Sequence, residues 1–456
     1  MSENVAREEN KMGILPVNKL LITMSVPMMA SMLVQALYNI VDSIFVSNIS
    51  ENALTAVSMA FPLQSMIIAI AGGTGVGVNA ILSKSLGEKE FERANKTAMN
   101  GIFLAVLSYI LFLIIGLTFV EPFYRSQTND PEIIKYGVDY LSIVLICSVG
   151  MFTQFIFERL LQSTGRTFYT MITQGTGAII NIILDPIFIF GLFGMPRMEA
   201  AGAAVATVVG QIVAGTMAIF MNIKKNPDIE LKLNGFKPDW GLIGQIYKIG
   251  IPSIIMQSIG SLMTYTMNKI LIEFSSTAVA VFGVYFKLQS FIFMPIFGLN
   301  NGMVPIIAYN YGAANKERMM KTWKLAWAYA TMIMAVGVFA FEVIPGTLFS
   351  FFNASDTMLE IGVPALRIIA IHFPVAAFCI VTGTMFQALG KSIYSMIVSI
   401  MRQLVVLIPA AILLSLLGSV NFVWLAFPIA EIMSCVVTVF FFKRLYKNII
   451  SHVGEA

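Results

Sequence analysis

Apolar runs of roughly 20 residues or more recur along almost the whole chain, separated only by short polar segments. A helix of about that length crosses the hydrocarbon core of a bilayer. Hydrophobic residues make up 57% of the 456 residues and charged residues only 12%, which is too little charge to cover the surface of a soluble protein of this size. We therefore expect an all-α polytopic membrane protein.

The polar breaks predict twelve transmembrane helices. The first apolar run follows a polar start, Met1–Asn10, without a small-residue cleavage site, so we expect it to be retained as a helix. The twelve expected spans are 20–46, 53–82, 95–119, 133–159, 167–190, 200–223, 246–272, 278–308, 320–342, 358–386, 392–416 and 421–442.

Lysine and arginine residues gather on one side of these predicted spans. Only Arg125, Lys135 and Arg197 fall on the opposite side. Because basic residues favour the cytoplasmic side, we expect both termini in the cytoplasm and the chain in the cell (inner or plasma) membrane. This placement also explains the net charge of +4, so no nucleic-acid partner is expected.

An internal repeat relates the two halves of the chain. Pro27 falls on Pro252, 225 residues later, and the register continues through glycines and loop residues. Examples are Gly73 with Gly298, Gly77 with Gly302, Gly87 with Gly312, Arg93 with Arg318 and Gly165 with Gly390.

Six spans per unit is an even number, so both copies enter the membrane in the same direction. The repeat therefore predicts two parallel six-helix bundles related by a pseudo-two-fold axis along the membrane normal, with a central cavity between them. We expect a first lobe over residues 1–223, a cytoplasmic linker over 224–245 and a second lobe over 246–456.

Two acidic residues fall inside predicted spans of the first lobe, where a carboxylate is costly and functional by default. Asp42 follows Asn39 on one face of the first span, and Asp185 follows Asn181 on one face of the fifth. Thr207 in the sixth span adds a hydroxyl. The alternative is that each aspartate caps a helix end or pairs with a lysine.

Carboxylate, amide and hydroxyl oxygens together suit a hard monovalent cation, and two repelling acids also make a proton acceptor. We therefore predict a cation-coupling site for H⁺ or Na⁺ at Asp42, Asn181, Asp185 and Thr207, with no other cofactor. The second lobe does not repeat the acid pair, because Met267 and Ala410 occupy the equivalent positions.

A substrate cavity is expected between the lobes. Its candidate polar residues are Asn39, Gln64, Lys287 and Gln289. The 29 methionines and 35 phenylalanines suit a cavity for apolar cations, although most of them must face lipid or pack in the core. Pro27 interrupts the first span and is predicted to act as a hinge.

Motifs of enzymes are missing from the sequence. It contains neither Gly-x-Ser-x-Gly nor His-Glu-x-x-His, and its only histidines are His372 and His452. An aspartic protease would have to use Asp42 and Asp185 without a supporting motif. We therefore expect a transporter and no enzyme.

The chain resembles the multidrug and toxic compound extrusion (MATE) family over essentially its whole length. The resemblance rests on the repeat, on the first span from Pro27 to Asp42, and on three short segments. These are Gln-Ser-Thr-Gly-Arg at 162–166, Asn-Ile-Ile-Leu-Asp-Pro at 181–186 and Ala-Ala-Gly-Ala-Ala-Val-Ala-Thr at 200–207.

The resemblance implies a V-shaped, two-lobed antiporter that exports amphipathic, mainly cationic drugs against an inward flow of protons or sodium. The family's acidic cluster maps onto Asp42, Asn181, Asp185 and Thr207. Some branches add a second-lobe cation site with an acid in the tenth span, but apolar residues surround Ala377 here, so no such site is implied.

A second interpretation stays within the same superfamily: a flippase or exporter of lipid-linked or anionic metabolites. The basic residues that would serve such a substrate are Lys269, Lys287, Arg367 and Arg402. In both interpretations the expected partners are small amphipathic molecules and the lipid bilayer, and a monomer is expected.

Overall fold

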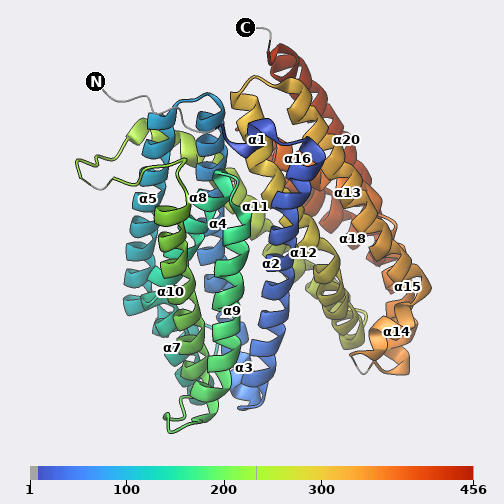
Figure 1. Cartoon of the computed structure of the whole chain (residues 1–456). Helices are drawn as coiled ribbons and strands as arrows, with labels where there is room; N and C mark the ends of the chain where they lie inside the picture. Colours follow the sequence, from blue (N-terminus) through green and yellow to red (C-terminus); the bar gives the residue numbers. More distant parts are fainter. Residues whose placement is uncertain (1–8, 233, 353, 455–456) are drawn as a thin grey trace.

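The structure, a computed structural model, describes residues 9–232, 234–352 and 354–454. The described chain is helical and contains no strand (Figure 1). Helices of the first lobe are α1 (Lys11–Ile14), α2 (Val17–Ser47), α3 (Glu51–Met59), α4 (Phe61–Gly87), α5 (Phe91–Thr118), α6 (Val120–Arg125), α7 (Pro131–Ile146), α8 (Val149–Ser163), α9 (Thr167–Phe190) and α10 (Ala200–Lys225). Those of the second are α11 (Trp240–Ile272), α12 (Ser276–Gly312), α13 (Lys316–Val343), α14 (Pro345–Ser350), α15 (Asp356–Ala370), α16 (Phe373–Ala388), α17 (Ser392–Ile400), the π-helix η1 (Met401–Leu407), α18 (Ile408–Ser415), α19 (Val420–Trp424), α20 (Ala426–Asn448) and η2 (Ile450–His452).

Twelve spans follow from these helices, as predicted. Within the described residues, nine segments are long and apolar enough to cross a membrane. Two more spans are bent pairs, α7 with α8 at 44° and α15 with α16 at 51°. The twelfth is α11, whose 33 residues suffice in length but include a series of polar side chains.

The repeat also sets where helices begin. Ser50 caps α3 by accepting the N–H of Ala53, and its repeat partner Ser275 caps α12 by accepting the N–H of Ala278. Asp130 and Ser355, again 225 residues apart, cap α7 and α15. A side-chain cap of this kind stabilises a helix by about 1 kcal/mol, so both units carry the same local start signals.

The lobes pack on each other at the end of the molecule where the described chain begins and ends, called here the terminal end, and diverge away from it (Figure 1). Repeat-related glycines make this contact. A Cβ on Gly77 of α4 would lie 2.3 Å from the carbonyl oxygen of Ile246, and one on Gly302 of α12 would lie 2.5 Å from Ser25 Oγ. Only glycine allows backbones to approach this closely.

Hydrogen bonds reinforce the same contact with the same symmetry. Arg318 of the second unit donates to the carbonyl oxygens of Met12 (3.0 Å) and Leu15 (2.7 Å), just before α2. Its repeat partner Arg93 donates to Gln245 Oε1 (3.0 Å) near the start of α11. Each unit therefore holds the beginning of the other unit's first span.

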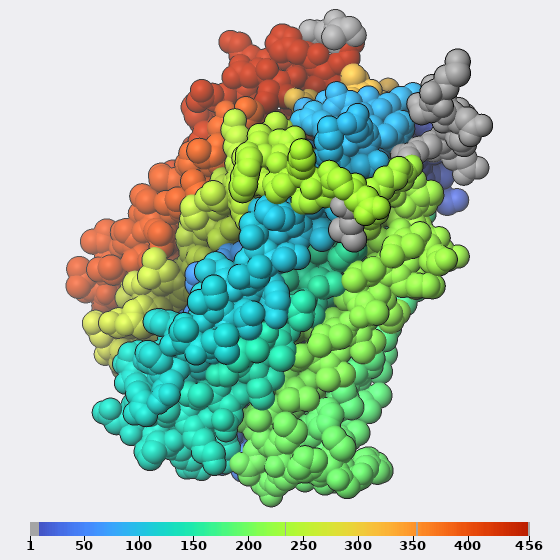
Figure 2. Space-filling view, turned by 90° about the vertical axis from the view of Figure 1, so that its left-hand side faces the viewer, coloured from blue at the N-terminus to red at the C-terminus, as the bar shows by residue number. Residues whose placement is uncertain are grey.

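The connection between the lobes is shorter than the predicted linker of residues 224–245, because α10 continues to Lys225 and α11 begins at Trp240. It crosses the first lobe at the terminal end, in lime green in Figure 2. Arg166 and Asp228 form an ion pair at 2.9 Å, and the N–H of Asp239 donates to Asn100 Oδ1 at 3.0 Å.

Replacing Gly302 with alanine is expected to open the contact at the terminal end, because the new methyl group would overlap Ser25. Spin labels at Lys225→Cys and Lys324→Cys should then report longer distances between the lobes by pulsed electron resonance. Gly283→Ala on the same helix is the control, since nothing lies within 4 Å of its Cβ position. An equal shift in both variants would contradict the close-packing argument.

Candidate functional site

The structure brings the predicted coupling residues together inside the first lobe. The carboxyl groups of Asp42 on α2 and Asp185 on α9 lie close enough to interact with each other. With the Asn181 amide oriented to satisfy both of its ends, it donates to Asp185 Oδ2 (3.3 Å) and accepts from the hydroxyl (3.1 Å) and N–H (3.0 Å) of Thr207. Three helices, α2, α9 and α10, thus supply the four residues.

The two aspartates have oxygens that the described chain does not satisfy. Asp185 is fully buried, and neither its Oδ1 nor Oδ1 of Asp42 has a hydrogen-bond partner among the described residues. An unpartnered buried carboxylate oxygen is expensive, so the arrangement favours a positive ion or a shared proton between the acids. Carboxylate, amide and hydroxyl oxygens are the kind of ligand that hard cations prefer.

Aromatic hydroxyls and one predicted cavity residue surround the acid pair. Tyr38 and Tyr140 are close enough to Asp42 to interact with it electrostatically. Gln64 of α4 donates to the hydroxyl of Tyr140 at 2.8 Å. Gln64 therefore belongs to the polar surroundings of the first-lobe acids.

A separate cavity of about 1060 Å³ lies mainly in the second lobe. Helices α11, α12, α16, α17, η1 and α20 contribute most of its lining, and α3, α4 and α8 of the first lobe contribute further residues, among them Asn79 and Arg159. Asp42, Asn181, Asp185 and Thr207 are not among its described lining residues. The ion site and the large cavity are therefore different places in the molecule.

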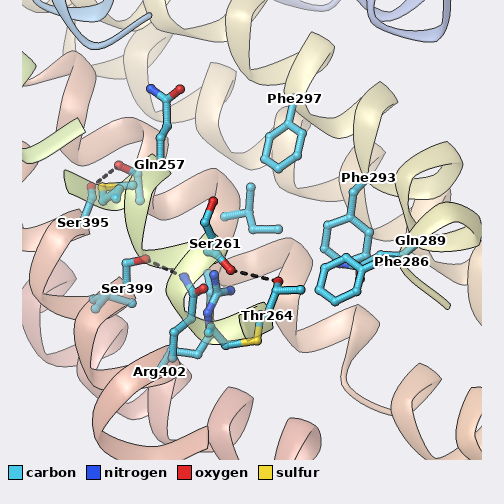
Figure 3. A pocket seen from close by; sticks show the side chains of 18 of the residues that line it. Gln257, Ser261, Thr264, Phe286, Gln289, Phe293, Phe297, Ser395, Ser399 and Arg402 are labelled. Carbon is cyan, nitrogen blue, oxygen red and sulfur yellow. Dashed lines mark hydrogen bonds between the residues drawn. The ribbon is translucent and has the colours of Figure 1, made fainter. Parts of the chain in front are cut away.

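The cavity has one aromatic and one polar wall (Figure 3). Phe286, Phe293 and Phe297 project from α12. Facing them are hydroxyl and amide side chains of α11 and α17, namely Gln257, Ser261, Thr264, Ser395 and Ser399, and Gln403 of η1 also lines the cavity. Such a cavity suits an amphipathic molecule with a flat apolar part.

A charged cluster lies in the same wall. Arg402 Nη1 is 3.5 Å from Glu431 Oε2, and His372 Nδ1 is 3.7 Å from the same oxygen. No partner for Glu431 could be predicted from the sequence, because these three residues come from three different spans. Among the described lining residues, the basic and acidic side chains are these three and Arg159.

The remaining predicted cavity residues are distributed differently. Gln289 lines the cavity, whereas Asn39 and Lys287 are exposed and outside its described lining. The Lys287 ammonium lies 5.8 Å from the centre of the Phe352 ring. Pro27 lies buried within the continuous helix α2, and the next two residues pack on Gly298 of the second lobe.

The polar wall can be recognised in the sequence as a regular pattern of polar residues, but the cavity residues predicted above do not belong to that pattern. Gln257, Ser261, Thr264 and Asn268 follow one another at intervals of four, three and four residues, which is one face of a helix. Ser395, Ser399 and Gln403 repeat this pattern at intervals of four. A polar stripe within an apolar span marks the face that a cavity solvates.

Comparisons with a protein-family model and with known proteins all point to transporters of one family. The protein-family model described as MatE matches residues 27–187 and again residues 252–413, which reproduces the 225-residue offset. The multidrug export protein MepA of Staphylococcus haemolyticus is 26% identical over 89% of both chains. An FAD transporter of Shewanella oneidensis is 24% identical over 95% of this chain and 96% of its own length.

A solved structure shares the whole architecture. It is an outward-facing multidrug resistance MATE family transporter of the MOP superfamily, similar with a TM-score of 0.90 and 25% identity. The match covers 98% of this chain and 99% of the other.

Ser261→Cys, introduced in a cysteine-free background, should react with a charged maleimide in lipid nanodiscs, because the side chain faces the large, partly polar cavity. Leu262→Cys is the matched control, since Leu262 is 52% exposed but outside the cavity lining, where lipid would keep its thiol neutral. Mass spectrometry of the intact protein measures the reaction. Equal labelling at both positions would contradict the assignment of the polar wall.

Proposed function

Since the chain belongs to the MatE family, and is therefore a multi-pass membrane transporter for multidrug efflux and not an enzyme, we propose that it works as a cation-coupled antiporter. In this proposal an inward flow of protons or sodium drives the export of amphipathic, mainly cationic compounds by alternating access. Both termini lie in the cytoplasm, as the distribution of basic residues indicates.

The observation that carries the coupling proposal is the acid pair. The carboxyl groups of Asp42 and Asp185 lie close enough to interact in the first lobe, and each keeps an unpartnered oxygen. Placing two negative charges this close inside the membrane is unfavourable unless a proton or a metal cation is bound with them. The pair should therefore always carry at least one positive ion while it is closed off from water.

Helix α2 offers a physical link between that ion and the lobes. Its far part carries Asp42, and its near part carries Ser25 and Met29, which touch Gly302 and Gly298 of α12. Pro27 lies between these contacts, where a missing backbone hydrogen bond lets the helix bend. A change of charge at Asp42 can therefore alter the packing that closes the terminal end.

Features of the cavity support export of aromatic amphipathic compounds. The faces of Phe286, Phe293 and Phe297 offer stacking and cation–π contacts to a flat cationic dye or drug. Related MepA proteins are named as multidrug exporters, which agrees with this substrate class.

One observation favours a second candidate, an exporter of anionic metabolites. Of the four basic residues considered from the sequence, only Arg402 is among the described residues that line the cavity, where it joins Arg159. A relative of similar length is an FAD transporter, and FAD is an anionic, aromatic molecule.

Asp42→Asn is expected to reduce ion-driven efflux of ethidium to the level of protein-free vesicles. The neutral amide can neither take up and release a proton nor supply the negative charge that holds a sodium ion. Proteoliposomes loaded with dye, with a pH gradient or a sodium gradient imposed separately, measure the rate and identify the ion. Asp139→Asn, which removes an exposed carboxylate from the same lobe, should transport at close to the wild-type rate. Wild-type transport that ignores both gradients would refute the coupling proposal.

A further inference from the structure

We propose that the cluster of Arg402, Glu431 and His372 is a binding site for an acidic group, a carboxylate or phosphate, carried by an amphipathic substrate. The inference rests on the proposed transport role of the second-lobe cavity, but not on ion coupling in the first lobe. It assigns a specific place to the negative end of a substrate whose aromatic part lies against α12.

Arg402 is placed to receive such a group. Its side chain is 27% exposed and lines the cavity, and η1, the π-helix that carries it, is a widened turn of the kind often found at functional sites. A guanidinium has five N–H donors. Among the described residues, its only hydrogen-bond acceptor is Glu431 Oε2, at 3.5 Å.

The carboxylate behind it is poorly satisfied. Glu431 is 4% exposed, and its Oε1 has no hydrogen-bond partner among the described residues. Both ring nitrogens of His372 are also buried without a hydrogen-bond partner among the described residues, and Nδ1 lies 3.7 Å from Glu431 Oε2. Structural ion pairs in apolar surroundings normally have short bonds and full partners, so this loose cluster indicates a place where partners are exchanged.

The geometry suggests how the exchange works. When no acidic group occupies the cavity, Glu431 compensates the charge of Arg402. A substrate carboxylate or phosphate can bind the same guanidinium through two parallel hydrogen bonds, a stronger arrangement than a single contact of 3.5 Å. Glu431 then retains His372, its other neighbour, as a partner.

Neighbouring side chains complete the site. Ser399 and Gln403 flank Arg402 along the chain, joined by a hydrogen bond of 2.9 Å from Gln403 Nε2 to Ser399 Oγ. Across the cavity, Phe286 and Phe293 face this polar wall (Figure 3). A molecule with an aromatic body and one acidic group can therefore contact both walls at once.

A matched pair of dyes tests the proposal. Rhodamine 110 has a free carboxylate, and rhodamine 123 is its methyl ester with the same aromatic body. Binding of each to the purified transporter is measured by equilibrium dialysis in detergent without an ion gradient. Arg402→Gln should weaken rhodamine 110 binding by at least about tenfold, since it removes a charge-assisted hydrogen-bond pair, and should leave rhodamine 123 almost unchanged.

Three further variants sharpen the result. Arg402→Lys should recover part of the rhodamine 110 affinity, and Glu431→Gln should raise it, because the internal competitor is lost. Arg367→Gln removes the same charge from an exposed arginine of the second lobe and should affect neither dye.

Other outcomes overturn the proposal. One is an Arg402→Gln variant that binds rhodamine 110 as well as the wild type, and another is an equal loss of affinity for both dyes in that variant, which would indicate a structural role. The proposal also fails if Glu431→Gln leaves the affinity for rhodamine 110 unchanged or lowers it. It fails as well if Arg367→Gln loses as much affinity as Arg402→Gln. A failure here leaves gradient-driven efflux untouched, whereas failure of ion coupling leaves the binding difference between the dyes in place.

Discussion

The high cost of leaving a polar group unsatisfied in hydrocarbon governs this molecule. Backbone groups meet that constraint by forming helices throughout the described spans. Side chains do not all meet it, because several buried polar atoms of the described residues have no hydrogen-bond partner. Two of the polar centres that result are an acid pair in the first lobe and an amphipathic cavity in the second.

The two centres are asymmetric although the fold is repeated. The repeat equivalents of Asp42 and Asp185 are Met267 and Ala410, and those of Arg402 and Glu431 are Gly177 and Ala206. By contrast, the glycines and arginines that join the lobes are repeated in both units. The duplicated architecture therefore supplies the hinge-like contact between lobes, and each lobe has acquired a different set of charges.

Much of the fold followed from local signals. Apolar length gave the twelve spans, and repeated caps such as Ser50 and Ser275 mark equivalent helix starts. Asp42 and Asp185 were recognisable as a pair because each lies within an apolar span beside an amide on the same helical face. The tighter connection between lobes was not predicted, since α11 begins at Trp240 within a polar sequence and its first turn is capped by Asp239.

The sequence by itself determined the number of spans, the duplication and the acids inside the membrane. All three can be recognised from residues that are close together along the chain or a fixed interval apart: the length of an apolar run, the repeated register, and a carboxylate within an apolar run. Only the tertiary structure decided that Glu431 lies beside Arg402 and His372, that Gly77 and Gly302 are inter-lobe contacts, and that Lys287 lies outside the cavity. These relations depend on how separate helices rotate and pack against one another. A polar residue in an apolar span shows that a partner or water must be near it, but the packing of the other helices decides which.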